Sequence, residues 1–368
     1  MAFGAVFAET GRASLDSPCA LQTLKNNSVN RPEKRVTLKD VAKACGYSAN
    51  TISRALRGDK KLPDHTRETI AKTAREMGYI RNLTAHTLRI GRSHLVAIII
   101  NDINNPYYTN MASEIDRQLS RSGFHMIIFC CHNDESLAEN MIQLAISMSV
   151  DGILFCPFSN PSHIIQLKNS NTPYVILDRR IEGLSYNSVR LDDESGGYEA
   201  AKMLIEHGHR RILYIAGPYV NSSQGDRQRG ILRAFGDYGL DASQLRILPW
   251  SALPAEKKAG QFFPLLLPLD YTALIAYNDY VAYHCLNDFR MHGVQVPRDI
   301  SMVSFDHIRR YNSSFPLLNS VTAREETVSE VAVRVLLEQI QHSETENQNI
   351  VLPITVHDDG TVVDCPGA

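Results

Sequence analysis

The sequence predicts an α/β fold built on parallel sheets, preceded by a small all-helical module. Between residues 94 and 306, short apolar segments alternate with segments of helical periodicity. The apolar segments are hydrophobic almost throughout, as strands are when helices cover both faces of a parallel sheet. Residues 36–81 instead contain three segments with helical spacing and no comparable apolar run.

Charge is unevenly distributed along the chain. The net charge is −2, yet residues 31–93 carry 15 Lys and Arg against 6 Asp and Glu. A basic module joined to an acidic remainder indicates that only the first part meets nucleic acid, whereas a merely solvated surface would mix the signs more evenly. Residues 1–35 lack the pattern of a signal peptide, because Glu9 comes early and no basic start precedes a long apolar run. We expect a disordered leader there.

The first two helices have the pattern of a helix-turn-helix, VTLKDVAKACGYSANTISRALR, over residues 36–57. Thr37 is placed to cap the first helix, Gly46 to end it, and Ser48 to cap the second. Small and polar residues suit a helix in the major groove of DNA, although the spacing alone also fits any two packed helices. Four such residues are expected to point outward: Ala49, Asn50, Ser53 and Arg54.

A third helix is expected to begin with Asp64 as its N-cap and to end at Gly78. Residues 82–93 follow, polar and basic with apolar side chains interspersed. This segment is too short to be stable alone as a helix, so we expect it to order on a partner.

The strands of the core are expected from His94 onward. Segments 94–101 and 124–131 are the first two, and both are expected to be buried. In parallel sheets, ligands bind beyond the carboxyl ends of the strands. Polar residues stand at these ends: Asn105, Asp178, Asn278 and Asp306.

Several classes of protein are not indicated. The sequence contains neither a G-x-G-x-x-G after the first strand nor H-E-x-x-H or G-x-S-x-G, and its 13 His are scattered, so we assign no catalytic residue, metal site or cofactor. No stretch approaches 18 uninterrupted apolar residues, so no transmembrane helix is expected. Seven cysteines without a paired C-x-x-C spacing fit a reducing cytosol.

The order of these parts resembles the lac-repressor/ribose-regulator family of bacterial helix-turn-helix transcriptional regulators. The matching segments include the helix-turn-helix, MGYIRN, NDINNPYY, PYVILDRR, DRQRG, AYND and VPRDISMVSFD, and they extend from residue 36 to about 356. The resemblance implies a DNA-binding headpiece over 36–81, a hinge helix over 82–93, and an effector-binding and dimerisation domain over 94–368. That last domain would consist of two doubly wound parallel-sheet subdomains, like periplasmic sugar-binding proteins, with crossovers near 191 and 321.

The sequence departs from the family at several points. Ala323 stands where many members have Gln, and Asp358-Asp359-Gly360-Thr361 replaces the usual Arg-x-Ser-Thr. No leucine-rich heptad tail follows, so the resemblance does not imply a tetramer.

The resemblance also assigns DNA-binding roles. Phosphate contacts fall to residues whose hydroxyls and helix N-termini suit anions: Thr37, Ser48, Thr51 and Ser53. Base edges would be met by Leu38, Ala49, Asn50 and Arg54. In the hinge, the matching residues are Asn82, Ala85 and Leu88. Leu88 would wedge between base steps in the minor groove. Capping alone remains an alternative for Thr37 and Ser48, and helix packing for Leu88.

The polar strand-end positions match those that hold sugar hydroxyls in ribose-binding-like proteins. Carboxylates accept, Arg donates and Asn does both, as a polyhydroxylated ring requires, and Tyr rings can stack on its apolar face. The effector residues so assigned are Asn105, Tyr107, Tyr108, Asp178, Arg179, Arg227, Asn278 and Asp306. Structural strand-end or core roles are the alternatives, and Asn221 and Asp192 are weaker candidates.

Together these features predict a cytoplasmic, homodimeric regulator, in particular a repressor. Its operator, a pseudo-palindromic DNA duplex, would be bound or released according to a small sugar held between the subdomains. A purine or nucleoside co-repressor is one alternative, a stand-alone sugar receptor without a DNA role is another, and an α/β enzyme is a third. No membrane partner is expected.

Overall fold

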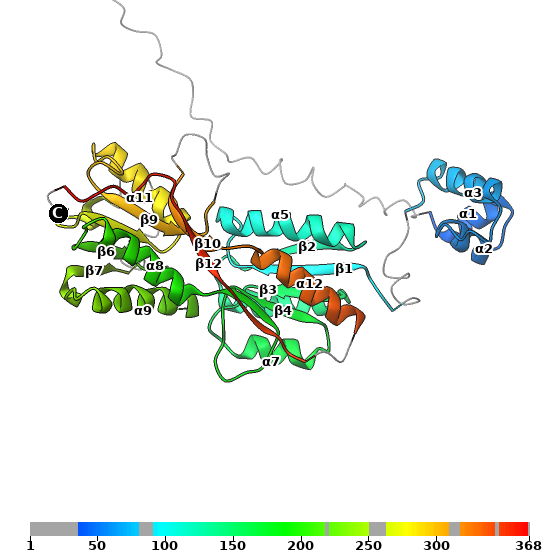
Figure 1. Ribbon diagram of the computed structural model, residues 1–368. Helices are drawn as coiled ribbons and strands as arrows, with labels where there is room; N and C mark the ends of the chain where they lie inside the picture. Colours follow the sequence, from blue (N-terminus) through cyan, green and yellow to red (C-terminus); the bar gives the residue numbers. More distant parts are fainter. Residues whose placement is uncertain are drawn as a thin grey trace, which may run out of the picture. The chain divides into compact units, whose positions relative to one another are not determined.

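The computed structural model describes residues 36–80, 91–217, 221–249, 263–308, 317–342 and 346–366. The chain forms two compact units, an N-terminal helical headpiece and a C-terminal α/β unit (Figure 1). The leader over 1–35 and the hinge residues Asn82, Ala85 and Leu88 lie outside the described residues. Of the helices in the described ranges, none has the length and hydropathy required to cross a membrane.

The headpiece consists of α1 (Leu38–Cys45), α2 (Ala49–Ala55) and α3 (Asp64–Glu76). Its small core contains Val41, Ile52 and Ile70, one from each helix and all fully buried. Ala55 and Ala74 complete this core of five buried apolar residues. Because the core is so small, the hydrogen bonds that cap the helix ends contribute an important part of the stability of this unit.

The caps of the headpiece are those that the sequence predicts, with one exception. Thr37 and Asp40 form a capping box on α1, and Gly46 ends this helix in the left-handed conformation at φ 71°. The Ser48 hydroxyl accepts a hydrogen bond from the Thr51 N–H. The exception is α3: its N-cap is Pro63, and Asp64 is already the first helical residue.

The first sheet of the α/β unit has the strand order β11-β5-β4-β3-β1-β2, and every pairing in it is parallel. Its strands are β1 (Leu95–Ile100), β2 (His125–Cys130), β3 (Gly152–Phe155), β4 (Tyr174–Leu177), β5 (Ser188–Leu191) and β11 (Asn349–Leu352).

Helices cover both faces of this sheet. Alternate residues of its strands point to opposite sides, so each face has its own apolar core. Val96, Ile98 and Ile100 pack in the core on one face, and Ala97 and Ile99 in the core on the other. The helices over the first face, α5 (Pro106–Arg121) and α12 (Val328–Gln341), lie side by side (Figure 1). Those over the second are α6 (Glu135–Ser147) and α7 (Ser162–Asn169).

The second sheet has the strand order β12-β10-β9-β8-β6-β7 and is parallel except at one edge, where β12 pairs antiparallel with β10. Its strands are β6 (Ile212–Ile215), β7 (Leu245–Leu248), β8 (Ala273–Ala276), β9 (Ser301–Phe305), β10 (Asn319–Ala323) and β12 (Ile354–His357). Its helices are α8 (Asp193–Glu206), α9 (Ser222–Asp237), η1 (Ala242–Gln244), α10 (Phe263–Leu266) and α11 (Asp279–Met291).

The predicted fold class, a helical headpiece followed by two parallel α/β subdomains, is therefore confirmed. We call the two halves of the α/β unit subdomain 1, built on the first sheet, and subdomain 2, built on the second. The chain passes between them after Leu191, after Ala323 and again at Pro353, between β11 and β12. Only the first two passages are predicted from the sequence.

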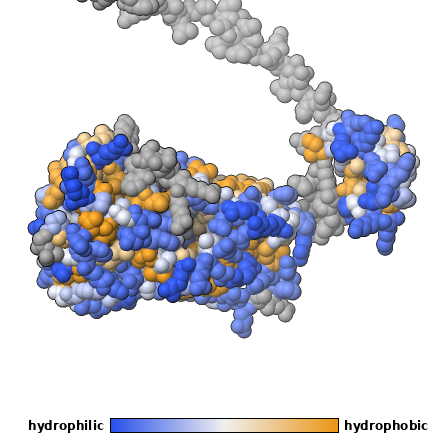
Figure 2. Space-filling model, turned by 45° about the horizontal axis from the view of Figure 1, so that its top comes forward, coloured by the Kyte–Doolittle hydropathy of each residue, from blue (hydrophilic) through white to orange (hydrophobic). Residues whose placement is uncertain are grey.

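Strand β2 differs from the prediction. It is an edge strand paired only with β1, and its residues are mostly half-exposed rather than buried, with Ile128 42% exposed. An edge strand has one open side, so its apolar composition alone overstates its burial. The face of the molecule in Figure 2 is largely hydrophilic, with apolar residues interspersed.

Candidate DNA-binding and effector sites

The headpiece presents most of the predicted DNA-contacting residues at its surface. Thr37, Ser48 and Asn50 are exposed, and Leu38, Ala49, Thr51 and Arg54 are half-buried. The hydroxyls of Ser48 and Thr51 lie 2.9 Å apart at the N-terminus of α2. A helix N-terminus carries unpaired N–H groups and partial positive charge, so a hydroxyl pair there suits a phosphate.

Ser53 does not have the outward position that the sequence analysis assigns to it. It is only 7% exposed and borders a hollow between α2 and α3 that is also lined by Leu56, Ala74 and Tyr79. Because α2 packs against both α1 and α3, its buried stripe is wider than that of a helix with one neighbour.

Arg54 is engaged within the headpiece. Its Nε donates to Asp59 Oδ2 at 2.8 Å. Asp59 also accepts from the Lys61 N–H, and these bonds lower the pKa of its carboxyl. Arg54 can therefore meet a base only by leaving or sharing this partner, a requirement that its sequence position does not reveal.

The second site is a cavity between the two subdomains. Its enclosed volume is about 90 Å³. All eight predicted effector residues line it: Asn105, Tyr107, Tyr108, Asp178, Arg179, Arg227, Asn278 and Asp306. Nine further residues line it, and of these the sequence indicates only Asn221 as a weaker candidate: Asp102, Asn133, Leu191, Asp193, Asn221, Ser223, Tyr277, Tyr280 and Val281.

Subdomain 1 contributes two aromatic hydroxyls and the residues that follow β4. The Tyr107 hydroxyl donates to Asp178 Oδ1 at 2.6 Å. Arg179 donates to the Pro157 carbonyl at 2.6 Å and, at 3.4 Å, to the Tyr108 hydroxyl. Burial raises the pKa of Asp178 to about 6, although its bond from Tyr107 acts in the opposite direction. Asp178 is therefore an acceptor with both a donor partner and limited access to water.

Arg227 is the central cation of subdomain 2. Its Nε donates to Asp193 Oδ1 at 2.7 Å and its Nη1 to the Tyr277 carbonyl at 2.6 Å. The guanidinium also lies over the rings of Tyr277 and Phe305, 4.8 and 4.2 Å from their centroids. These contacts fix the plane of the group, so it is preorganised for ligand oxygens.

Asp306 follows β9 and faces Arg227, with 4.0 Å between Oδ1 and Nη2. Its backbone has φ 95°, which is strained for a residue with a Cβ. Burial is the main reason why the pKa of this carboxyl is raised to about 8. Arg227 lowers this pKa, whereas the nearby carboxyls of Asp279, Asp178 and Asp193 raise it. Strain and costly burial at one carboxyl are typical of a functional position.

Three asparagines of the cavity share one arrangement. Asn105, Asn221 and Asn278 are the N-caps of α5, α9 and α11, and each side-chain oxygen accepts a backbone N–H of the first helical turn. The structural role that the sequence analysis keeps as an alternative is thus present for Asn105 and Asn278. It does not exclude ligand binding, because capping uses the oxygen and orients the amide N–H groups, which can only donate.

One of the two weaker candidates lies elsewhere. Asp192 caps α8 by accepting from the Ser195 N–H and does not line the cavity. Its neighbour Asp193 does, paired with Arg227. A shift of one residue at a helix start rotates the side chain by about a quarter turn, and sequence alone does not fix that register.

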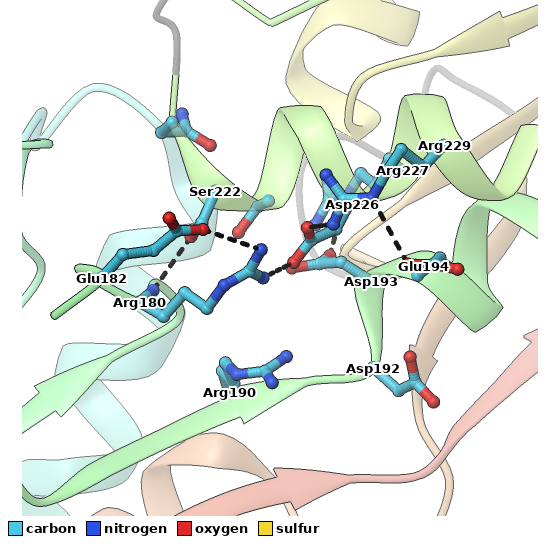
Figure 3. A network of polar contacts seen from close by, with 12 residues as sticks. Arg180, Glu182, Arg190, Asp192, Asp193, Glu194, Ser222, Asp226, Arg227 and Arg229 are labelled. Atoms are coloured by element: carbon cyan, nitrogen blue, oxygen red, sulfur yellow. Dashed lines mark hydrogen bonds and ion pairs between the residues drawn. The ribbon is translucent and has the colours of Figure 1, made fainter.

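Polar contacts also connect the subdomains beside the cavity (Figure 3). The Ser223 hydroxyl donates to the Asp178 carbonyl, and the Arg180 N–H donates to the Ser222 hydroxyl, both at 2.9 Å. The Arg180 guanidinium pairs with Asp226 on α9. Within the described ranges, no cluster of His, Cys, Asp and Glu could hold a metal ion.

Comparison with known families matches both units. Residues 37–82 match the family described as bacterial regulatory proteins, lacI family, and residues 201–362 match the periplasmic binding protein-like domain. The HTH-type transcriptional regulator DegA of Bacillus subtilis is 28% identical over 325 residues, 87% of this chain and 96% of its own. The HTH-type transcriptional repressor PurR of Erwinia tasmaniensis is 26% identical over 333 residues, 90% of this chain and 98% of its own.

Solved structures share the fold. A complex of the transcriptional regulator CelR with cellobiose has a TM-score of 0.62 at 25% identity, covering 89% of this chain and 100% of its own. The lac repressor dimer bound to operator and the anti-inducer ONPF has a TM-score of 0.75 at 22% identity, covering 90% of this chain and 100% of its own.

Proposed function

Because the chain belongs to the lacI family of bacterial DNA-binding transcriptional regulators, which are not enzymes, we propose that it is a homodimeric repressor controlled by a sugar. The sugar would bind between the two subdomains and change the affinity of the headpiece for a pseudo-palindromic operator. The family assignment already includes operator binding and a small-molecule effector. The sugar, the dimer and the role as a repressor are the proposal.

One observation carries the choice of a sugar: the convergence of Asp178, Arg227 and Asp306 on one cavity from both subdomains. Buried carboxylates accept hydrogen bonds from hydroxyls, and a fixed guanidinium donates to ring and hydroxyl oxygens. The amides of the three capping asparagines supply further donors. This mixture suits a ligand with a hydroxyl group on nearly every carbon, because each hydroxyl both donates and accepts hydrogen bonds.

The charges of the cavity favour an uncharged sugar. Asp102, Asp178 and Asp193 line it, together with the cations Arg179 and Arg227, whereas Asp306, whose pKa is raised to about 8, holds its proton near neutral pH. A phosphate or carboxylate on the ligand would add negative charge beside buried carboxylates, where Coulomb repulsion is little screened. CelR, the solved relative with cellobiose, offers an example of an uncharged sugar in this fold.

The DNA role is supported by the headpiece itself. Its basic composition and its exposed Asn50 suit a duplex, and a dimer would place two recognition helices on two half-sites. The lac repressor is a dimer on its operator in the solved complex. The stand-alone receptor alternative gives the headpiece no role.

The test uses the full chain against a panel of uncharged sugars, sugar phosphates, purines and nucleosides. Thermal-shift screening identifies the ligand, and calorimetry measures its dissociation constant. Arg227→Ala should weaken binding at least about tenfold, because it removes charge-assisted bonds and leaves Asp193 unpaired. Asp270→Asn, at an exposed carboxyl outside the cavity, is the control.

The alternative is distinguished in the same panel. Binding of a purine or nucleoside, with no response to any sugar, would replace the sugar by a purine co-repressor. Binding of a sugar that leaves the affinity for selected operator DNA unchanged would contradict the regulatory role.

A further inference from the structure

The segments that hold the proposed effector also make the contacts that cross between the subdomains. On subdomain 1 these contacts come from residues 178–180 after β4, and on subdomain 2 from the first turns of α9. Asp178 directs its side chain to Tyr107 in the cavity and its carbonyl to Ser223 across the subdomain boundary. Ligand contacts and subdomain contacts are therefore made by the same backbone.

Side chains alternate between the two tasks along these segments. Arg179 lines the cavity, whereas the next residue, Arg180, pairs with Asp226 outside it. On α9, Asp226 receives Arg180, whereas the next residue, Arg227, faces the cavity. A displacement of α9 that breaks one contact would therefore move the other.

Asp226 is well suited to hold the cation from the other subdomain. Its side chain is only 5% exposed, and Arg229 of the same helix also pairs with it. Glu194 on α8 pairs with Arg229 at 3.4 Å (Figure 3). Glu194 also pairs with Arg233 at 2.9 Å, so the acidic and basic groups form one chain of ion pairs. Within this chain of ion pairs, Arg180 and its exposed partner Glu182, 3.7 Å away, come from subdomain 1, and Arg180 is the one that reaches subdomain 2. A buried carboxylate loses more by separation from a cation than an exposed one does.

We propose that Arg180 is a positioning residue for effector binding: it latches subdomain 1 to Asp226 and thereby holds the closed cavity. The latch does not touch the ligand. It adds to the stability of the closed arrangement, and a ligand that contacts both subdomains binds that arrangement more tightly. This inference rests on the proposed function only for the identity of the ligand.

The experiment compares Arg180→Met with Arg233→Met in the full chain. Arg180→Met keeps the length of the side chain and removes the charge and donors. Arg233→Met removes a neighbouring ion pair whose two members, Arg233 and Glu194, both lie in subdomain 2. Hydrogen exchange of peptides covering 178–182 reports the subdomain contact directly, because the Arg180 N–H is bonded to Ser222.

Arg180→Met should speed hydrogen exchange in residues 178–182. It should also lower the affinity for the effector that the panel identifies by about tenfold, mainly through faster dissociation. Arg233→Met should do neither. Arg180→Lys should restore part of both effects, and Asp226→Asn added to Arg180→Met should weaken binding little further, because partners in one contact are not additive.

Equal exchange in Arg180→Met and Arg233→Met would overturn the latch, as would faster exchange with unchanged effector affinity. The measurement of exchange needs no ligand. If wild-type protein bound no sugar, the proposed function would fail, whereas the exchange data would still decide whether Arg180 joins the subdomains.

Discussion

Asp306 is the residue at which burial and charge conflict most strongly. Its pKa is raised from an ordinary value of 3.8 to about 8, chiefly by burial. At pH values between 3.8 and about 8, the carboxyl is ionised in the unfolded chain but still protonated in the folded protein. The native state therefore binds more protons, and the free energy of unfolding falls as pH rises through this window.

Asp306→Asn should remove this loss, because an amide does not ionise, and Asn also tolerates the positive φ of this position. We expect the variant to be more stable than wild type at pH 8, by up to about 5 kcal/mol, with the difference vanishing near pH 4. Chemical denaturation at pH 4, 6 and 8 measures it. Asp270→Asn is the control, and a stability difference that does not change with pH would contradict the argument.

At the DNA face, Asn50 is the residue whose exposure best fits direct readout. Asn50→Ala should weaken binding to the selected operator by about 1–3 kcal/mol and relax the preference for one base pair in each half-site. Affinity for an unrelated duplex should hardly change, because phosphate contacts remain. Fluorescence anisotropy with both duplexes decides it. Equal losses on both would show that Asn50 contacts the backbone rather than a base.

At this scale the sequence is informative about residue type and less so about partners. The strand-end positions Asn105, Asp178, Asn278 and Asp306 could be predicted to share one cavity because polar groups at the carboxyl ends of parallel strands meet at one place. The other four proposed effector residues, Tyr107, Tyr108, Arg179 and Arg227, follow only from the family resemblance, and they line the same cavity. Asp193 and Tyr277 could not, because their roles follow from the register of α8 and the path after β8. The burial of Ser53 and the pairing of Arg54 with Asp59 likewise depend on three helices packing together.

At the scale of elements, the close approach of α8 and α9 positions Arg227 against Asp193. Two glycines allow it: a Cβ on Gly230 would lie 1.9 Å from the Glu194 carbonyl oxygen, and one on Gly197 would lie 2.0 Å from that of Arg227. Both clashes are with backbone, so the helices themselves must separate. The sequence shows these glycines, but only the packed pair of helices gives the reason for them.

Gly230→Ala should therefore destabilise the protein by about 2 kcal/mol or more and also weaken effector binding, since Arg227 lies on the displaced helix. Gly236→Ala is the matched control on the same helix, because its Cβ would meet nothing within 4 Å. It should stabilise by about 0.4–1 kcal/mol. Thermal unfolding and calorimetry measure both. Equal effects of the two substitutions would mean that α8 and α9 are not in close contact.

Alternation of strands and helices predicts the elements of the core well, whereas the sheet position of a strand is harder to predict. Strand β2 is apolar apart from His125, yet it lies at an edge with Ile128 exposed. Strands β11 and β12 are separated only by Pro353 but belong to different sheets. The sheet to which a strand belongs, and its place in that sheet, depend on pairing between segments far apart in the sequence, which a local hydrophobic pattern does not report.

For the whole molecule, the division into a basic headpiece and a cavity-bearing unit predicts two ligands with different sensitivities to salt. Operator binding displaces counterions from DNA and should weaken steeply as salt rises, whereas binding of an uncharged sugar should hardly change. Titrations of each ligand alone between about 50 and 200 mM salt separate the two. A sugar affinity as salt-dependent as operator binding would indicate a charged ligand or a shared site.

Control of operator binding by the effector must also be reciprocal. If the sugar lowers operator affinity by some factor, the operator lowers sugar affinity by the same factor, because the four states form a closed thermodynamic cycle. We expect a factor of about 5–150, measured by calorimetry of the sugar with free and operator-bound protein and by anisotropy of the operator with and without sugar. Arg180→Met should reduce the factor, since a weaker latch narrows the difference between the two arrangements of the subdomains that the sugar distinguishes. Unequal factors in wild type would mean that the measured states are not the same four, as when the dimer dissociates. An unchanged factor in Arg180→Met would mean that the contact between Arg180 and Asp226 does not contribute to the coupling between sugar and operator.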